Sequence, residues 1–175
     1  MPKPGGILAA FYRGDMKDDR GRALEEIQAW DFDRLESTHD YIQWLFPLPE
    51  PSGANPRAPV LDASDIAAFR AEPALRARLL ASFRAMLAFY GFSLEERDGK
   101  PVLARAGDFE ARAANWLTPH NHNFLRLTRI LRSLDVLGLP QYARALFVAL
   151  ERTHRKNPAI VGSITFGYWM RAAPL

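Results

Sequence analysis

Apolar side chains recur at spacings of three and four residues along most of this chain, and no other feature restricts its fold as strongly. That spacing places the apolar side chains on one face of an α-helix. Residues 73–90 and 123–137 show the spacing over the longest distances. Pro73 and Pro140 suit the first turn of a helix, and Gly138 suits the end of one. The sequence therefore predicts helices over most of the chain.

One short segment breaks the helical pattern. Asp98-Gly99 lies between "LEER" and "KPVL", and this dipeptide favours a two-residue β-hairpin turn. We expect an all-α fold, a single compact domain over residues 1–175 with about six or seven helices and one small β-hairpin near residues 94–103. A chain of 175 residues suits one hydrophobic core. Because the chain contains no cysteine, its stability must come from packing rather than from disulfides.

The stretch "ESTHDYIQWLFPLPEP", residues 36–51, is rich in aromatic side chains and could form either a site or a core. We expect it to continue one helix that is capped by Asp31 and ends before Pro47. His39 falls on the apolar stripe of that helix. A histidine in such a position is more often a hydrogen-bonded core residue than a base or a ligand.

Tyr41 and Trp44 fall on other faces of the same predicted helix. Tyrosine and tryptophan bury a large area while they keep one polar group, so both residues could line a binding groove. They could equally pack against the helix that contains Tyr90. These two side chains are the only ones of this stretch that we expect to be available for binding.

The C-terminal stretch, residues 158–175, contains "SITFGYWM" and is expected to dock onto the rest of the domain. It could do so as a capped short helix or as an extended segment. Tyr168 and Trp169 argue against a disordered tail, since such large rings favour burial.

Three segments, in order, carry a resemblance to a known family: "HDYIQWLFP" at 39–47, "LAFYGF" at 87–92 and "LRLTRILRSLDVLGL" at 125–139. In this order and at these separations they resemble the conserved N-terminal domain of the opioid growth factor receptor family, from about Phe11 to about Leu150. Vertebrate members of that family bind an enkephalin peptide. The resemblance therefore implies a non-catalytic helical module that binds a peptide or protein partner. We expect that role to need a concave apolar groove bordered by Trp44 or Trp116.

The strongest concentration of polar side chains is "NWLTPHNHNFLRLTR", residues 115–129. The resemblance maps the family's conserved motif here onto residues that include Trp116, His122, Asn123, Arg126 and Arg129. Exposed N–H groups at a helix N-terminus attract anions, and arginines add directional donors, so a small anion or metabolite could bind there or react there. Alternatively, Asn123 caps the helix, and Arg126 and Arg129 pair with acidic residues. A true site requires these polar side chains to converge on one pocket.

The charge composition leaves a third alternative open. The chain carries 23 lysine and arginine residues against 20 acidic ones, and arginine supplies almost all of the positive charge. An arginine-rich surface can bind phosphate, so nucleic acid is an alternative partner. The same composition is typical of a GC-rich bacterial genome, and a bacterial source would make an opioid ligand implausible.

These considerations define the expected site. The candidate ligand-binding residues are Tyr41, Trp44, Trp116, His122, Asn123, Arg126 and Arg129. We expect no catalytic residue, cofactor or metal, because His120 and His122 form only a weak H-x-H pair and no nucleophile motif is present. No apolar run is long enough to cross a membrane, and no signal peptide is evident, so we expect a cytoplasmic protein.

Overall fold

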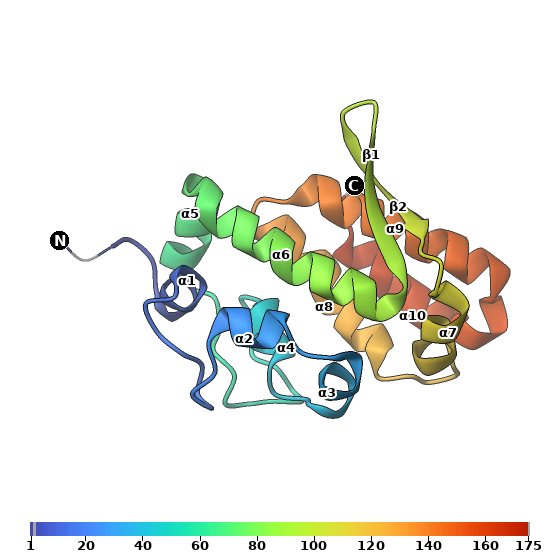
Figure 1. Ribbon diagram of the computed structural model, residues 1–175, viewed down its shortest axis with the longest axis horizontal. Coiled ribbons are helices and arrows are strands. Elements are labelled where there is room, and N and C mark those ends of the chain that lie inside the picture. Colours follow the sequence, from blue (N-terminus) through green and yellow to red (C-terminus); the bar gives the residue numbers. More distant parts are fainter. Residues whose placement is uncertain (2, 175) are drawn as a thin grey trace. The chain divides into compact units, whose positions relative to one another are not determined.

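The structure, a computed structural model, describes Met1 and residues 3–174. Pro2 and Leu175 belong to the predicted domain, and Leu175 also to its predicted C-terminal tail, but both lie outside the described residues. The described residues form ten helices and one two-stranded antiparallel sheet (Figure 1). This confirms the predicted helical fold with one small hairpin. The helices outnumber those expected because several in the N-terminal half have only one or two turns.

The elements are α1 (Ile7–Arg13), α2 (Leu24–Gln28), α3 (Phe32–Ser37), α4 (Ile42–Leu45), α5 (Ala63–Ala71), α6 (Pro73–Tyr90), β1 (Phe92–Arg97), β2 (Lys100–Arg105), α7 (Phe109–Trp116), α8 (Asn123–Val136), α9 (Pro140–Lys156) and α10 (Pro158–Ala172). They fall into two compact units. Unit 1 comprises residues 1–85 and 136–138, and unit 2 comprises residues 86–135 and 139–175. Helix α6 supplies residues to both units. That the whole chain is one domain stays a prediction.

In unit 1, the buried side chain of Asp65 joins the first turns of α1 and α5. One carboxylate oxygen accepts a hydrogen bond from the backbone N–H of Ala9 at 2.9 Å. Asp65 also forms a capping box with Asp62, whose side chain accepts from the N–H of Asp65 at 2.8 Å. The spacing of the two aspartates predicts this box, whereas the bond to α1 depends on the tertiary fold.

The prediction of one helix from Asp31 to Phe46 is wrong. Residues 38–41 separate α3 from α4, and Thr38 has an extended backbone with φ −101° and ψ 131°. Residues 37–40 are Ser, Thr, His and Asp, which all have low helix propensity. The break removes His39 from the apolar stripe and leaves it exposed, so the prediction of a core histidine is also wrong.

In unit 2, β1 and β2 form the predicted hairpin, with Arg97 paired to Lys100 across the turn. Asp98 and Gly99 both have positive φ, 52° and 72°, as a type I′ turn requires. Within the described chain this sheet has no third strand, so the outer edge of β2 has no strand partner. Helix α9 packs against β2, which places the hairpin beside this helix (Figure 1).

The C-terminal tail is the helix α10, which is kinked at Gly162, where φ is 77°. Trp169 is fully buried, and its indole N–H donates to the backbone oxygen of Phe124 at 3.2 Å. Its ring meets the ring of Phe124 edge-on, with centroids 5.8 Å apart. The tail therefore docks as a helix rather than as an extended segment. No helix among the described residues is long and apolar enough to cross a membrane.

Candidate functional site

The loop before α8 satisfies its own polar groups. The side-chain oxygen of Asn121 accepts hydrogen bonds from the backbone N–H and the side-chain amide of Asn123, at 2.9 and 3.0 Å. The amide group of Asn121 donates to the hydroxyl of Thr118 at 2.9 Å and to the backbone oxygen of Asn115 at 3.1 Å. The side-chain oxygen of Asn121 therefore already occupies a backbone donor at the start of α8 that an anion would need. That Asn123 caps the helix stays a prediction.

Asn123 and Arg126 are buried and lie in an interior polar network of unit 2. The Asn123 oxygen is 3.4 Å from the hydroxyl of Tyr90 and 3.5 Å from a guanidinium nitrogen of Arg126. The indole N–H of Trp116 donates to the backbone oxygen of Tyr90 at 3.0 Å, and their rings meet edge-on. Because Trp116 has no exposed surface, it cannot border an open groove here. In this structure these groups hold the interior of the unit together.

His122 and Arg129 occupy different surroundings from this network. His122 is exposed and helps to line a hollow of about 370 Å³ between the start of α8 and α10. Arg129 is half-buried and does not line that hollow, nor do Asn123 and Arg126. The structure therefore does not bring the four predicted polar residues to one pocket.

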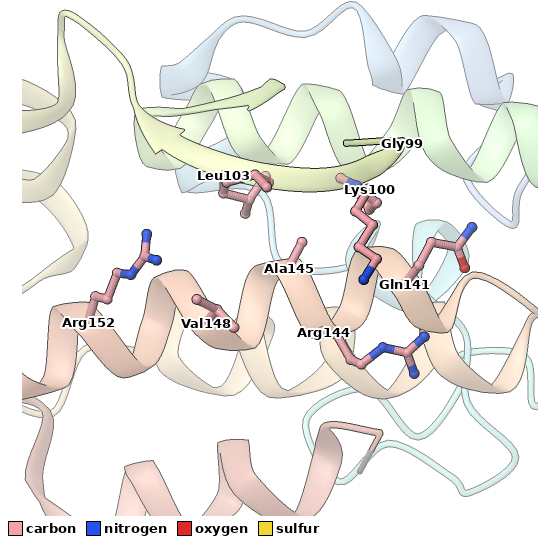
Figure 2. Close-up of a pocket in the computed structure, with 10 residues that line it drawn as sticks. Gly99, Lys100, Leu103, Gln141, Arg144, Ala145, Val148 and Arg152 are labelled. Carbon is pink, nitrogen blue, oxygen red and sulfur yellow. The ribbon is translucent and has the colours of Figure 1, made fainter. Parts of the chain in front are cut away.

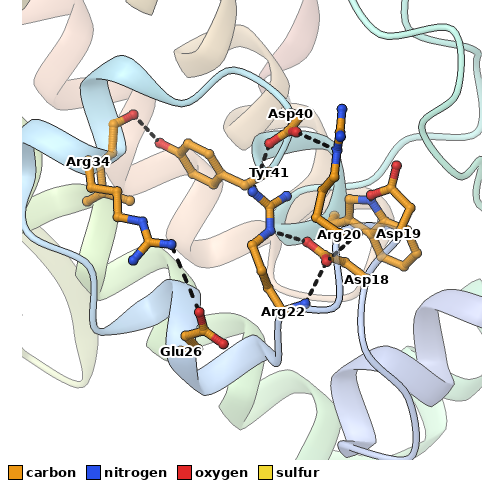
Figure 3. A network of polar contacts seen from close by, with 10 residues as sticks. Asp18, Asp19, Arg20, Arg22, Glu26, Arg34, Asp40 and Tyr41 are labelled. Carbon is orange, nitrogen blue, oxygen red and sulfur yellow. Dashed lines mark hydrogen bonds and ion pairs between the residues drawn. The ribbon is translucent and has the colours of Figure 1, made fainter.

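Tyr41 and Trp44 pack within unit 1. The hydroxyl of Tyr41 donates to the backbone oxygen of Leu35 at 2.8 Å (Figure 3), and its ring meets Trp30 edge-on. The ring of Trp44 lies edge-on to Phe11 with centroids 5.1 Å apart. Both side chains are at most 4% exposed. Neither therefore lines an open groove, and their predicted role in ligand binding receives no support from the structure.

An ion-pair network of unit 1 joins residues 18–22 to Asp40, the residue before Tyr41. Arg22 bridges Asp18 and Asp40 at 2.7 and 2.9 Å, and Arg20 adds a second contact to Asp40 (Figure 3). The indole N–H of Trp44 donates to Asp19 at 3.1 Å. Three carboxylates thus lie with two arginines, so this part of unit 1 is a structural assembly rather than an open anion site.

A groove between β2 and α9 in unit 2 has the composition of a binding site, although none of its residues was a predicted site residue. It encloses about 510 Å³. Its lining consists of Gly99, Lys100, Pro101, Val102, Leu103, Gln141, Arg144, Ala145, Val148 and Arg152. Figure 2 shows Leu103 and Lys100 reaching from β2 toward α9, and Arg152 reaching from α9 toward the hairpin side. We call this the β2–α9 groove.

The β2–α9 groove combines apolar surface with cations that have no counterion. Among the described residues, no acidic side chain forms an ion pair with Lys100, Arg144 or Arg152. Val148, which is 41% exposed, lies between the two arginines in sequence. A ligand with negative charge and an apolar group would complement both properties.

A second hollow of about 260 Å³ adjoins the β2–α9 groove and shares Leu103 and Arg152 with it. Its lining includes Lys156, and also Arg105, which pairs with Glu110 at 3.4 Å. The cationic surface therefore continues along α9 beyond Arg152.

A sequence signal for the groove exists, because Arg144, Val148, Arg152 and Lys156 recur every four residues along α9. Such a repeat places side chains near one another on a helix surface. The same repeat is also typical of a solvated helix face. It cannot identify a groove by itself, because β2, a distant segment of the chain, supplies the opposite wall.

Comparison with known proteins adds a family relationship. The sequence profile described as the opioid growth factor receptor conserved region matches residues 10–173. The chain is 44% identical over 158 residues to the opioid growth factor receptor of Rattus norvegicus, a match that covers 86% of this chain and 27% of that protein. It is 40% identical over 169 residues to the receptor of Homo sapiens, covering 93% and 24%.

A further relative is the opioid growth factor receptor-like protein 1 of Mus musculus, 37% identical over 140 residues, which cover 78% of this chain and 29% of that protein. The matches thus span 24–29% of the length of these relatives. No solved structure matches the chain. The family match also extends beyond the predicted resemblance and includes all of α10, whose Trp169 packs on α8.

Proposed function

The chain belongs to the family defined by the opioid growth factor receptor conserved region, and we propose that it is a non-catalytic helical module that binds a peptide or protein partner. Its relatives are named as receptors, which supports a binding role. We assign the partner to the β2–α9 groove rather than to the predicted residues around Trp44 and Trp116, because those two rings are buried.

One observation carries this proposal, namely an open groove with an apolar floor and with cations that form no ion pair with any described residue. Its volume of about 510 Å³ lies within the range of about 300–1,000 Å³ that is common for ligand sites. The lining contains no carboxylate, histidine or hydroxyl group that could act as a general base. It does offer cationic donors and apolar side chains, and this combination favours binding over acid–base catalysis.

Selection of peptides from a random display library would test the proposal. The bait is the whole chain, and Val148→Glu serves as the counter-bait. Val148 is exposed on α9, so the substitution should leave the fold intact while it places a charge on the groove floor. We expect peptides that bind the wild-type chain at least about ten-fold more tightly than the variant, the difference expected for a buried unpaired charge.

Leu125→Glu is the matched control. Leu125 is an apolar residue of α8 that is 68% exposed and lines the hollow near His122 rather than the β2–α9 groove. Selected peptides should bind this variant as they bind the wild type. If no peptide is enriched, or if Val148→Glu and Leu125→Glu bind every enriched peptide equally well, the groove is not a peptide site.

A further inference from the structure

We propose that the occupant of the β2–α9 groove is an extended acidic peptide segment whose carboxylates pair with Arg144, Arg152 and Lys156. This inference rests on the proposed function and specifies the chemical class of the partner. It follows from the charge of the groove, from the edge of β2 and from the spacing of cations along α9.

The cations of this groove form no ion pair with the described residues, whereas two acidic residues near them are already paired. Glu151, on the same helix, pairs with Arg155 at 3.2 Å. Glu95, on the neighbouring strand, pairs with Arg97 at 2.8 Å. Arg144 and Arg152, by contrast, form no ion pair with any described residue. The unpaired arginines therefore favour an anionic partner.

The apolar floor distinguishes a peptide from a simple anion. Val148 lies one helical step of four residues from both Arg144 and Arg152. An inorganic anion would leave this exposed apolar side chain in water. A peptide can cover Val148 with an apolar side chain while its carboxylates reach the arginines on either side.

The free edge of β2 favours an extended occupant. Pro101 is paired with Glu96 in the hairpin register but has no N–H to donate, so it must occupy a position that is not hydrogen-bonded to β1. Positions alternate in an antiparallel pair, so the main-chain groups of Leu103 also point away from β1. Leu103 lines the β2–α9 groove and the adjoining hollow. Because Leu103 is only 4% exposed, the edge positions open to an extended peptide are those of Pro101 and Arg105, which share its orientation and line the groove and the adjoining hollow.

The spacing of the cations predicts the positions of the carboxylates. Arg144 and Arg152 are two steps of four residues apart, about 12 Å along α9, and Lys156 lies about 6 Å further at about 1.5 Å per residue. An extended chain advances about 3.3 Å per residue, so carboxylates about four and then about two residues apart match this spacing. Even separations also place them on the same face of the peptide. An apolar residue on that face, between the first two carboxylates, would lie over Val148.

The probe is a labelled seven-residue peptide with glutamate at its first, fifth and seventh positions, valine at the third and threonine elsewhere. Fluorescence anisotropy measures its binding to the whole chain at low salt. An isomer with the same composition but with consecutive glutamates is the peptide control. We expect the designed peptide to bind at least about ten-fold more tightly than the isomer, because only its carboxylates match the three cations.

Charge reversal identifies the contact residues. Arg152→Glu should weaken binding of the designed peptide by about ten- to a hundred-fold, the loss expected for a charge-assisted contact. Arg84→Glu makes the same change of net charge at an exposed arginine of α6 that does not line the groove, and should change binding less than about two-fold. Lys100→Glu, on the opposite wall, provides a second test if Arg152→Glu fails to fold.

Four outcomes would overturn the inference. Equal binding of the two peptide isomers would contradict the predicted spacing of the carboxylates. Equal effects of Arg152→Glu and Arg84→Glu would show that the peptide binds outside the β2–α9 groove. Tighter binding of a single-stranded oligonucleotide of matched charge, with the same dependence on Arg152, would assign the groove to nucleic acid. If display selection instead yields peptides that depend on Val148 but lack acidic residues, this inference fails while the proposed peptide-binding function stands.

Discussion

The buried carboxylate of Asp65 accepts hydrogen bonds from the N–H of Ala9, in the first turn of α1, and from the N–H of Asp62, the N-cap of α5. Burial raises its pKa above the ordinary value, although the backbone N–H of Ala9 acts in the opposite direction. Its neighbour Asp62 shows the reverse, because hydrogen bonds from Ser64 and from the N–H of Asp65 lower the pKa of that carboxyl. Two aspartates in one capping box thus differ in pKa because only one of them is buried.

The raised pKa of Asp65 predicts a pH dependence of stability. Since the folded-state pKa lies above the ordinary value of 3.8, the folded state binds the proton more tightly than the unfolded chain. The stability that this group contributes is therefore fully present below that ordinary pKa and is lost as the pH rises through the folded-state pKa. Asp65→Asn removes the titration, so across this window the free energy of unfolding should fall more steeply with pH in the wild type than in the variant.

Urea denaturation of both proteins at a series of pH values measures the difference. Asp33→Asn, which removes an exposed carboxyl of α3, reports the general effect of losing one negative charge and should leave the pH dependence close to that of the wild type. Parallel curves for the wild type and Asp65→Asn would show that Asp65 titrates alike in the folded and unfolded states.

At the scale of elements, α9 has one face that packs in unit 2 and another that lines the β2–α9 groove. Ala143, Leu146 and Leu150 are buried, and they provide the packing that holds the helix in unit 2. Arg144 and Arg152 are exposed and line the β2–α9 groove. The helix can therefore present a charged face without loss of stability, because its attachment depends on the opposite face.

The hairpin turn offers a test of the element that forms the other wall of this groove. Gly99 has a φ of 72° and no atom within 4 Å of an added Cβ, so only its backbone conformation opposes a side chain. Gly99→Ala should lower the free energy of unfolding by about 1–2 kcal/mol, the cost of the left-handed conformation for an L-residue. Urea denaturation measures this loss, and faster amide hydrogen exchange in β1 and β2 would locate it.

Gly107 provides the matched control for this substitution. It is also surrounded by open space, but its φ lies outside the left-handed region, so Gly107→Ala should change the free energy of unfolding by no more than about 0.5 kcal/mol. An equal loss in the two variants would show that the positive φ of Gly99 is not the cause of the loss.

At the scale of the whole molecule, helix α6 runs without a break from residues of unit 1 into residues of unit 2. A helix that contributes to two cores cannot melt in one of them without fraying in the other. We therefore predict that the two units unfold in one transition, as expected of a single domain.

Trp169→Ala tests this prediction. Trp169 is fully buried in unit 2, and its truncation should cost about 3–5 kcal/mol. Amide hydrogen exchange should then lose protection by similar amounts in α5 of unit 1 and in α8. Ile164→Ala, a change at a residue of the same helix that is 75% exposed, should leave both unaffected. Loss of protection confined to unit 2 would show that the units unfold separately.

Local signals in the sequence determined most of the elements. The spacing of apolar residues, the prolines at the starts of α6 and α9 and the Asp98-Gly99 turn act through neighbouring residues, so these features could be predicted directly. The family resemblance was also present in the sequence, and the profile match confirms it. The weak helix formers at residues 37–40 were a local signal too, but the apolar stripe concealed the break that they cause.

The location of the site depended on the tertiary structure. Trp44 and Trp116 have the side chains of binding residues, yet packing partners from distant segments cover them, and no spacing rule reveals which rings are covered. The groove likewise joins Lys100 of β2 to Arg152 of α9. The sequence by itself determined which residues form helices and which form the hairpin. Only the packing of the hairpin against α9 decided which cations share one groove, because burial and proximity between distant segments are properties of the assembled core.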